Sequence, residues 1–225
     1  MHNRTMETAA ATIAALFAWV LFRGRRQRRR RGRTYIVSPR NSTRVAADGA
    51  VHSLQSAHIE LPRAELDRLW APAQLENLGR TYWRFLSRAT LGAIRVIYGE
   101  HERVVVLLAR PLRLLRFEAP TYTLEPDHAN INWAIRDGLL VSPSGRGCGF
   151  LAVTVRRDTD RGEPAKVDVD VEVANFYPAI ASGLGTNFYR ATQSFVHVLL
   201  THAFLRSLDT LELAESKVGR LRQHD

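Results

Sequence analysis

The chain has 225 residues and a formal net charge of +10, a length that suits one domain with appendages. Its basic residues are concentrated: eight arginines lie between Arg23 and Arg33, whereas residues 51–213 carry 18 basic and 18 acidic side chains. This balance argues against specific nucleic-acid binding by residues 51–213, because such a domain keeps a basic face. The single cysteine, Cys148, excludes an internal disulfide framework.

The uncharged run AAATIAALFAWVLF, residues 9–22, directly precedes the arginines. With its flanks it reaches the ~17 residues that a short membrane-spanning helix needs, and arginines after such a run tend to stay in the cytoplasm. We therefore predict an anchor at residues 1–33: a single-pass helix in the cell membrane, with the body cytoplasmic and the arginines on the anionic membrane surface. The charge order opposes a cleaved signal peptide. A peripheral amphipathic anchor, a nucleic-acid arm and an incorrectly assigned start codon remain alternatives.

Residues 34–50 are small and polar and predict a linker. A first strand is expected at residues 51–61, followed by two short helices at 63–70 and 73–92. Six strand-like runs come next, separated by short connectors rich in Gly, Glu, Asp and Pro, as in antiparallel hairpins. They cover residues 93–98, 103–110, 112–124, 129–142, 149–157 and 166–176.

The last of these runs contains VDVDVEV, in which valines alternate with Asp168, Asp170 and Glu172. Such alternation predicts one covered and one solvated face, so we assign these carboxylates to solvent. Residues 186–211 predict a long helix whose apolar stripe lies on the sheet. Residues 214–225 are expected to form a polar tail. The stripe comprises Phe188, Thr192, Phe195, Val196, Leu199 and Ala203, with Arg190, Ser194, His197 and Thr201 on the opposite face.

This element order resembles the START/SRPBCC superfamily over residues ~51–211. The resemblance is carried by the helix pair after the first strand and by VEVANFYPAIA leading into FYRATQSFVHVLLTHAFLRSL. It implies an α+β helix-grip domain at residues 51–213. In this fold one curved antiparallel seven-stranded sheet wraps around the C-terminal helix, with a cavity between them. Superfamily members bind lipids, sterols, polyketides, quinones or hormones, and a minority are cyclases or hydrolases.

The resemblance also implies where a ligand would bind. The expected apolar lining is Phe117, Trp133, Ile135, Leu151, Val153, Val169, Val171, Phe195 and Leu199, and the expected polar groups are His202, Asn175 and Tyr177. Each has a plain alternative role. The apolar set would be ordinary core, His202 a hydrogen-bonded core histidine, and Asn175 and Tyr177 turn-making residues before a proline.

No sequence pattern predicts a metal site, a cofactor or a catalytic residue. The histidine spacings do not suit one metal ion, and GRGCG at residues 145–149 precedes a strand, so a hairpin turn is expected there rather than a phosphate loop. We predict a membrane-tethered cytoplasmic domain that binds a hydrophobic small molecule or lipid, with no specific nucleic acid as partner. Two alternatives remain: a cyclase- or aromatase-type enzyme of the same fold, and a non-catalytic interaction module with a filled core.

Overall fold

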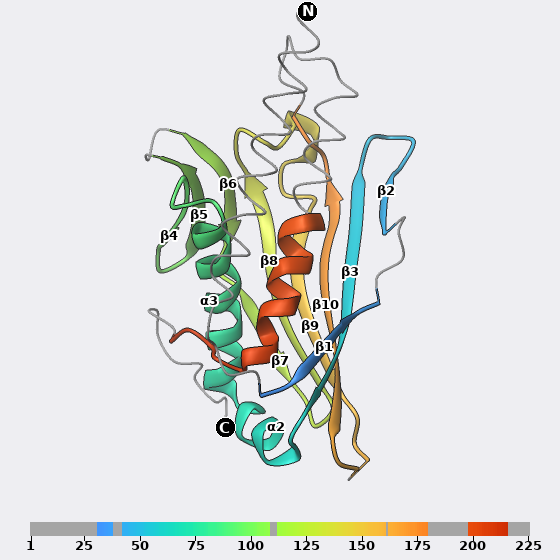
Figure 1. The fold of residues 1–225 in the computed structure, drawn as a ribbon. Coiled ribbons are helices and arrows are strands. Elements are labelled where there is room, and N and C mark those ends of the chain that lie inside the picture. The colour runs from blue at the N-terminus through green and yellow to red at the C-terminus, as the bar shows by residue number, and fades with distance from the viewer. Residues whose placement is uncertain (1–30, 38–41, 109–111, 161, 180–197, 216–225) are drawn as a thin grey trace, which may run out of the picture.

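The computed structural model describes residues 31–37, 42–108, 112–160, 162–179 and 198–215. They form an α+β fold with a ten-stranded antiparallel sheet (Figure 1). The strand order is β1-β3-β10-β9-β8-β6-β5-β4, with β2 paired to β3 and β7 paired to β8. The strands are β1 (Arg33–Ile36), β2 (Thr43–Val45), β3 (Val51–Leu61), β4 (Ile94–Tyr98), β5 (Glu102–Leu107), β6 (Arg113–Glu118), β7 (Thr121–Leu124), β8 (His128–Asp137), β9 (Phe150–Arg157) and β10 (Ala165–Phe176).

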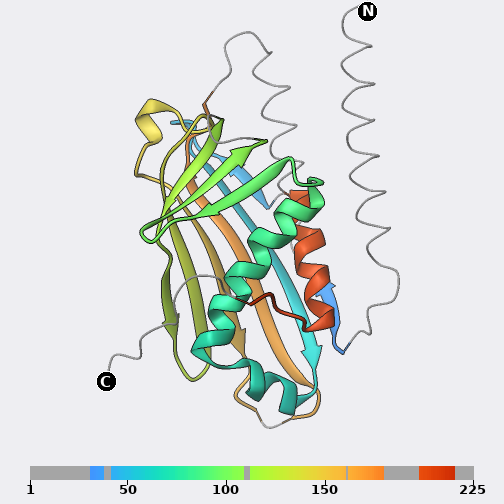
Figure 2. The same cartoon turned by 90° about the vertical axis from the view of Figure 1, so that its left-hand side faces the viewer.

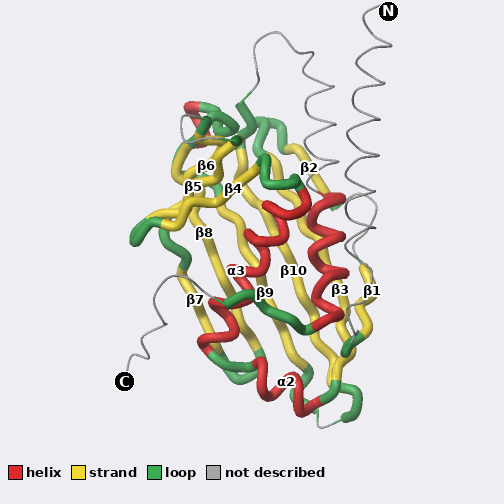
Figure 3. Tube along the Cα trace, turned by 60° about the vertical axis from the view of Figure 1, so that its left-hand side comes forward, coloured by secondary structure: helices red, strands yellow, loops and turns green. Residues whose placement is uncertain are grey.

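The helices lie on one face of this sheet. Helices α2 (Arg63–Leu69) and α3 (Pro72–Ala89) follow β3, and a short helical turn, η1 (Pro143–Gly145), follows β8. The C-terminal helix is described at residues 198–207 and continues into the turn η2 (Leu208–Thr210). Figures 2 and 3 show α3 and the C-terminal helix side by side across the curved sheet, with α2 at one end.

The predicted alternation of β10 is confirmed. Val167, Val169 and Val171 are buried, whereas Asp168 and Asp170 between them are only half-buried. This pattern follows from the two-residue repeat of a strand, which sends successive side chains to opposite faces. The valines therefore face the helices.

An aromatic cluster fills the interior between α3, the sheet and the C-terminal helix. The ring centres of Trp83 and Trp133 are 5.3 Å apart, and those of Tyr82 and Phe204 are 5.1 Å apart. Gly79 on α3 permits this approach, because a β-carbon there would lie 3.1 Å from the Trp133 ring. This part of the interior is a packed core.

The sheet has ten strands where the sequence predicts seven. Two extra strands, β1 and β2, pair with β3 and come largely from the segment expected to be a linker. The expected strand at residues 112–124 is divided into β6 and β7 around Pro120, because proline has no N–H for the hydrogen-bond ladder.

The predicted single-pass membrane location is wrong. Within the described ranges, no helix is long and apolar enough to cross a bilayer. Residues 9–22, on which the prediction rested, and the arginines up to residue 30 lie outside those ranges.

Candidate functional site

An apolar pocket lies between the sheet, α2, the start of α3 and the chain after the C-terminal helix. Its volume is about 100 Å³. Five strands supply its floor, the two helices one wall, and residues 208–213 the other. The lining comprises Ile59, Leu61, Leu66, Leu69, Trp70, Ala71, Gln74, Leu75, Leu78, Leu124, Ala129, Val155, Val167, Val169, Leu208, Leu211 and Leu213.

The floor of the pocket is a row of small side chains across four strands. Val169 pairs with Ala57 on one side and Val155 on the other, and Val155 pairs with Ala129. Val169, Val155 and Ala129 of this row line the pocket, and the small side chain of Ala129 leaves volume unfilled at its end of the row. The next row towards the aromatic cluster is larger and fully buried, and comprises Gln55, Val171, Val153 and Ile131.

Trp70, at the end of α2, is a fixed part of the wall. Its indole Nε1–H donates a hydrogen bond of 2.9 Å to the carbonyl oxygen of Glu125. The guanidinium carbon of Arg157 lies 4.5 Å from the centre of its ring, a geometry that favours a cation–π contact. The ring is therefore held from two sides while it lines the pocket.

Residues 208–213 close the pocket opposite α2. Leu211 has a φ of 55° after η2, which turns the chain sharply, and Leu208 and Leu213 lie on either side of it in the sequence. The backbone N–H of Ala214 then donates a hydrogen bond of 2.8 Å to the Thr81 hydroxyl on α3. This bond fastens the closing segment to the opposite wall.

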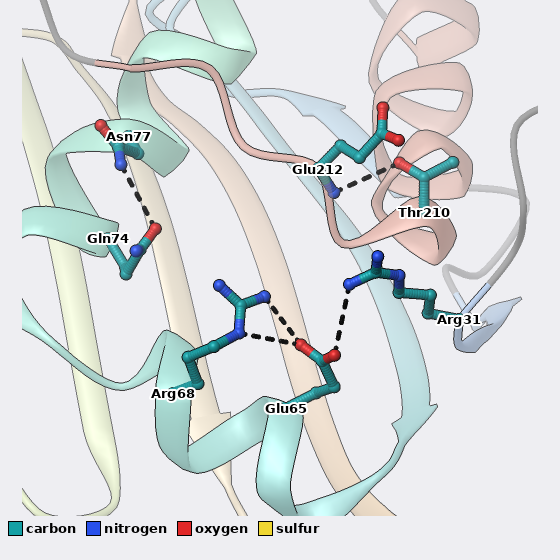
Figure 4. Close-up of polar contacts among 7 residues, drawn as sticks. All are labelled: Arg31, Glu65, Arg68, Gln74, Asn77, Thr210 and Glu212. Carbon is teal, nitrogen blue, oxygen red and sulfur yellow. Dashed lines mark hydrogen bonds and ion pairs between the residues drawn. The ribbon is translucent and has the colours of Figure 1, made fainter.

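Several polar contacts lie beside pocket-lining residues in the sequence, and Figure 4 shows them on α2, on α3 and on the segments before β1 and after the C-terminal helix. Glu65 on α2 accepts a hydrogen bond of 2.7 Å from Arg68 and lies 3.3 Å from the Arg31 guanidinium. The hydrogen bond from Arg68 lowers the pKa of the Glu65 carboxyl. On α3, Asn77 donates a hydrogen bond of 3.2 Å to Gln74. The apolar interior thus has a polar border that links α2 with the segment before β1.

The chemistry of the lining is limited to apolar contact. Gln74 and Trp70 carry the only polar side-chain atoms among the lining residues, and the Trp70 N–H is already bonded. The lining contains no carboxylate, imidazole, amine, thiol or hydroxyl group to act as an acid, base or nucleophile. Nor do the described residues hold a group of three His, Cys, Asp or Glu side chains placed for a metal ion.

Of the ligand-binding residues predicted from the sequence, only Val169 lines this pocket. Leu199 is half-buried on the C-terminal helix, and Phe195 lies outside the described residues. The remaining apolar residues are buried in the packed core and comprise Phe117, Trp133, Ile135, Leu151, Val153 and Val171. Their contact with a ligand stays a prediction.

His202 and Gln55 form a polar contact that the sequence did not predict as a pair. The Nε2 atom of His202 lies 2.7 Å from Oε1 of Gln55, whose side chain is fully buried on β3. Burial, and to a smaller extent Arg206, lowers the pKa of His202, so the neutral ring with hydrogen on Nε2 suits this bond. The Gln55 amide in turn donates to Ser53 at 3.2 Å.

The other two predicted polar residues lie away from both the pocket and His202. Asn175 is exposed, with a φ of 50°, next to an irregularity in the pairing of β10. Tyr177 donates a hydrogen bond of 2.8 Å to the carboxylate of Asp48. The structure therefore does not bring the three predicted polar groups together.

No family model matches the sequence, and no curated protein matches it. The structural neighbours include START-domain proteins. Human STARD10 is 8% identical with a TM-score of 0.35, over 81% of this chain and 70% of its own. Human StAR-related lipid transfer protein 5 is 12% identical with a TM-score of 0.34, over 91% and 98%. An HSP90 activator from Plasmodium falciparum is 14% identical with a TM-score of 0.31, over 72% and 94%. Scores of this size do not assign a function, so the pocket carries the argument.

Proposed function

We propose that the protein binds a hydrophobic small molecule or lipid and buries an apolar part of it in the pocket beneath α2. The observation that carries this proposal is an unfilled volume lined almost entirely by aliphatic side chains. Protein interiors are normally packed to crystal-like density, and here the neighbouring row of the sheet is fully buried. The space beside it can take an apolar group without displacing core side chains.

The size of the pocket limits what fits inside it. At about 100 Å³ it is smaller than the ~150 Å³ apolar cavity that accommodates benzene. A branched or straight chain of a few carbons matches this volume, and burying each CH₂ is worth about 0.8 kcal/mol. A longer ligand would have its remaining part at the polar border near Arg68 and Gln74.

The residues predicted from the sequence would join the site only if the ligand extended further. Val171 and Val153 lie one row beyond Val169 on the same face of the sheet. A ligand reaching them would have to separate the C-terminal helix from the sheet. A larger site of this kind, between the sheet and the C-terminal helix, is the more specific version of the proposal.

The proposal can be tested by titrating the full chain with n-alkanols and measuring their binding by calorimetry. We expect an affinity that rises with chain length. Val169→Phe, which places a ring in the pocket, should abolish alkanol binding. Val171→Leu adds bulk to the same strand outside the pocket lining and should retain it.

Two outcomes would count against this function. If no alkanol binds the wild-type chain, the pocket does not act as a ligand site, and the result favours the alternative of an interaction module with a filled core. If Val169→Phe binds alkanols as the wild type does, the ligand occupies another part of the protein.

A further inference from the structure

Four exposed leucines lie at one end of the sheet, in or beside the turns that join its elements. Leu91 follows α3 and is 71% exposed, and Leu139 follows β8 and is 58% exposed. Leu108 and Leu112, on either side of the connection between β5 and β6, are 65% and 43% exposed. Single exposed leucines are ordinary on protein surfaces, whereas a group of them indicates an interaction site.

Backbone hydrogen bonds place these leucines on neighbouring parts of the chain. The N–H of Leu108 donates to the carbonyl of Ala93 at 2.7 Å, two residues after Leu91. The N–H of Leu107 donates to Leu112 at 3.0 Å, and that of Leu139 to Arg113 at 3.0 Å. We call the surface formed by Leu91, Leu108, Leu112 and Leu139 the leucine rim.

The backbone at two of these positions disfavours leucine. Leu91 and Leu108 have φ values of 54° and 58°, in the left-handed region where a β-carbon is strained and glycine is preferred. Folding favours glycine at both positions, and solubility favours polar residues. Leucine is therefore unfavourable at both exposed positions, for the backbone and for solubility.

The charge around the leucine rim is strongly positive. The described segments 86–98, 104–108, 112–117 and 134–149 contain six arginines and one acidic residue, Asp137, and a second carboxylate, that of Glu102, lies 2.9 Å from Arg116, which leaves a net charge of +4. Asp137 is already paired with Arg116 at 3.2 Å. The exposed arginines are Arg88, Arg95, Arg113, Arg136 and Arg146.

We propose that the leucine rim is a docking surface for an anionic lipid bilayer. The leucines enter the boundary between headgroups and acyl chains, and the arginines contact the anionic headgroups, as interfacial protein segments do. Nucleic acid is a poorer fit, because phosphate contacts leave protruding aliphatic side chains without a partner. This contact is peripheral and reversible and uses no membrane-spanning helix.

The leucine rim is separate from the apolar pocket. Leu91 follows the C-terminal end of α3, whereas the pocket lies at the N-terminal end, and Figure 1 shows α2 at the end of the molecule away from β5 and β6. The 18 residues of α3 span about 27 Å at 1.5 Å per residue. Docking and ligand binding can therefore be tested independently.

The chain supplies its own reporter for the experiment. Cys148 is its single cysteine and is exposed. Its loop joins the end of β8, where the N–H of Gly147 bonds to the carbonyl of Arg136 at 3.0 Å. An environment-sensitive fluorophore on Cys148 of the full chain should shift to the blue with vesicles of phosphatidylcholine and phosphatidylserine, and not with phosphatidylcholine alone.

The decisive variant is Leu91→Gly combined with Leu108→Gly. Glycine relieves the left-handed backbone, so the melting temperature should be unchanged or higher, while the lipid concentration for half-maximal shift rises about tenfold. Leu54→Ser, which removes an exposed leucine from β3, should match the wild type. Arg95→Gln with Arg113→Gln should weaken binding and its dependence on salt.

Three results would overturn the proposal. The first is co-sedimentation of the chain with anionic vesicles while the Cys148 label stays unchanged, which would place the contact elsewhere. The second is equal vesicle binding by the glycine variant and the wild type. The third is an equal label response to duplex DNA, which would make the surface a general polyanion site.

Discussion

Val169 and Val171 provide a matched test of whether the pocket is truly unfilled. Both are on β10, both face the helices, and both are buried, with 3% and 0% of their surface exposed. Only Val169 borders the pocket. We expect Val169→Phe to leave the free energy of unfolding unchanged or raise it, and Val171→Phe to lower it.

The magnitudes follow from the volume of the pocket. Residual cavity volume costs about 24 cal/mol per Å³, so filling all of about 100 Å³ would stabilise the fold by at most ~2.4 kcal/mol. Adding the same ring at Val171, where the structure is packed, costs about 1–3 kcal/mol through overpacking. The two variants should therefore differ by about 3 kcal/mol, or ~6–12 °C in melting temperature for a domain of this size.

Urea unfolding followed by circular dichroism measures this difference directly. The slope of the free energy with urea should be the same for both variants, because a change in slope would indicate an altered unfolded or native state. Equal destabilisation by the two phenylalanines would refute the reasoning, since it would mean that the pocket is as tightly packed as its neighbour.

Three further predictions address the parts around the pocket. The pKa of His202 is lowered in the folded state, so on acidification the unfolded chain binds a proton at His202 before the folded chain does. The free energy of unfolding should therefore fall as the pH drops below about 6.5. In urea titrations between pH 7 and 5, His202→Gln should make the free energy of unfolding less dependent on pH. Gly138→Ala should lower the free energy of unfolding by more than ~2 kcal/mol, because the new β-carbon would lie 2.3 Å from a backbone oxygen. Gly147→Ala should cost only about 1 kcal/mol, because nothing lies within 4 Å of a β-carbon at that position. Equal melting temperatures for the two variants would contradict this prediction. Thr81→Val removes the acceptor of the Ala214 N–H and should cost about 1 kcal/mol while making the C-terminal segment easier to cleave by protease; an unchanged cleavage rate would show that the bond does not hold the segment.

Local pattern was sufficient to predict most of the sheet. The alternation in VDVDVEV depends only on neighbouring residues, and β10 follows it. The strands β1 and β2 are different: each is four residues or fewer, and they have no apolar alternation of their own. They form because β3 offers an unpaired edge, which is a property of the assembled sheet.

The helical wheel misplaced part of the C-terminal helix. Thr201 was assigned to the polar face, yet it is 1% exposed, and Phe204 and Leu205 are fully buried with it. Threonine can hydrogen-bond to its own helix, so its polarity is a weak guide to the face it occupies. The buried face depends on where the sheet and α3 lie, which the wheel does not contain.

The sequence suggested an apolar site but not its location. The predicted cavity lies under a helix expected at residues 186–211, of which the structure describes residues 198–211; beside this part the aromatic rings of Tyr82, Trp83, Trp133 and Phe204 pack together, and ligand binding there stays a prediction. The pocket lies where Val169, Val155 and Ala129 form one row across β10, β9 and β8, opposite helix α2. Leu66 and Leu69, apolar positions on the short helix after the first strand, were the one local signal for it.

The sequence also did not predict how charged residues are distributed over the surface of the folded chain. Residues 51–213 are neutral as a whole, which led us to expect no basic face. Folding nevertheless gathers Arg95, Arg113 and Arg136, three exposed arginines from three different strands, near one end of the sheet. A sum over the sequence cannot detect a patch made from separate segments.

Methyl NMR of the full chain during titration with n-octanol tests the central claim most directly. If the pocket beneath α2 binds the apolar part of a ligand, the methyl signals of Leu66, Leu75 and Val169 should shift together and saturate, while those of Val153 and Leu151 stay in place. Shifts confined to Val153 and Leu151 would move the site into the aromatic core, and no shift in any of these methyl groups would contradict ligand binding by this fold.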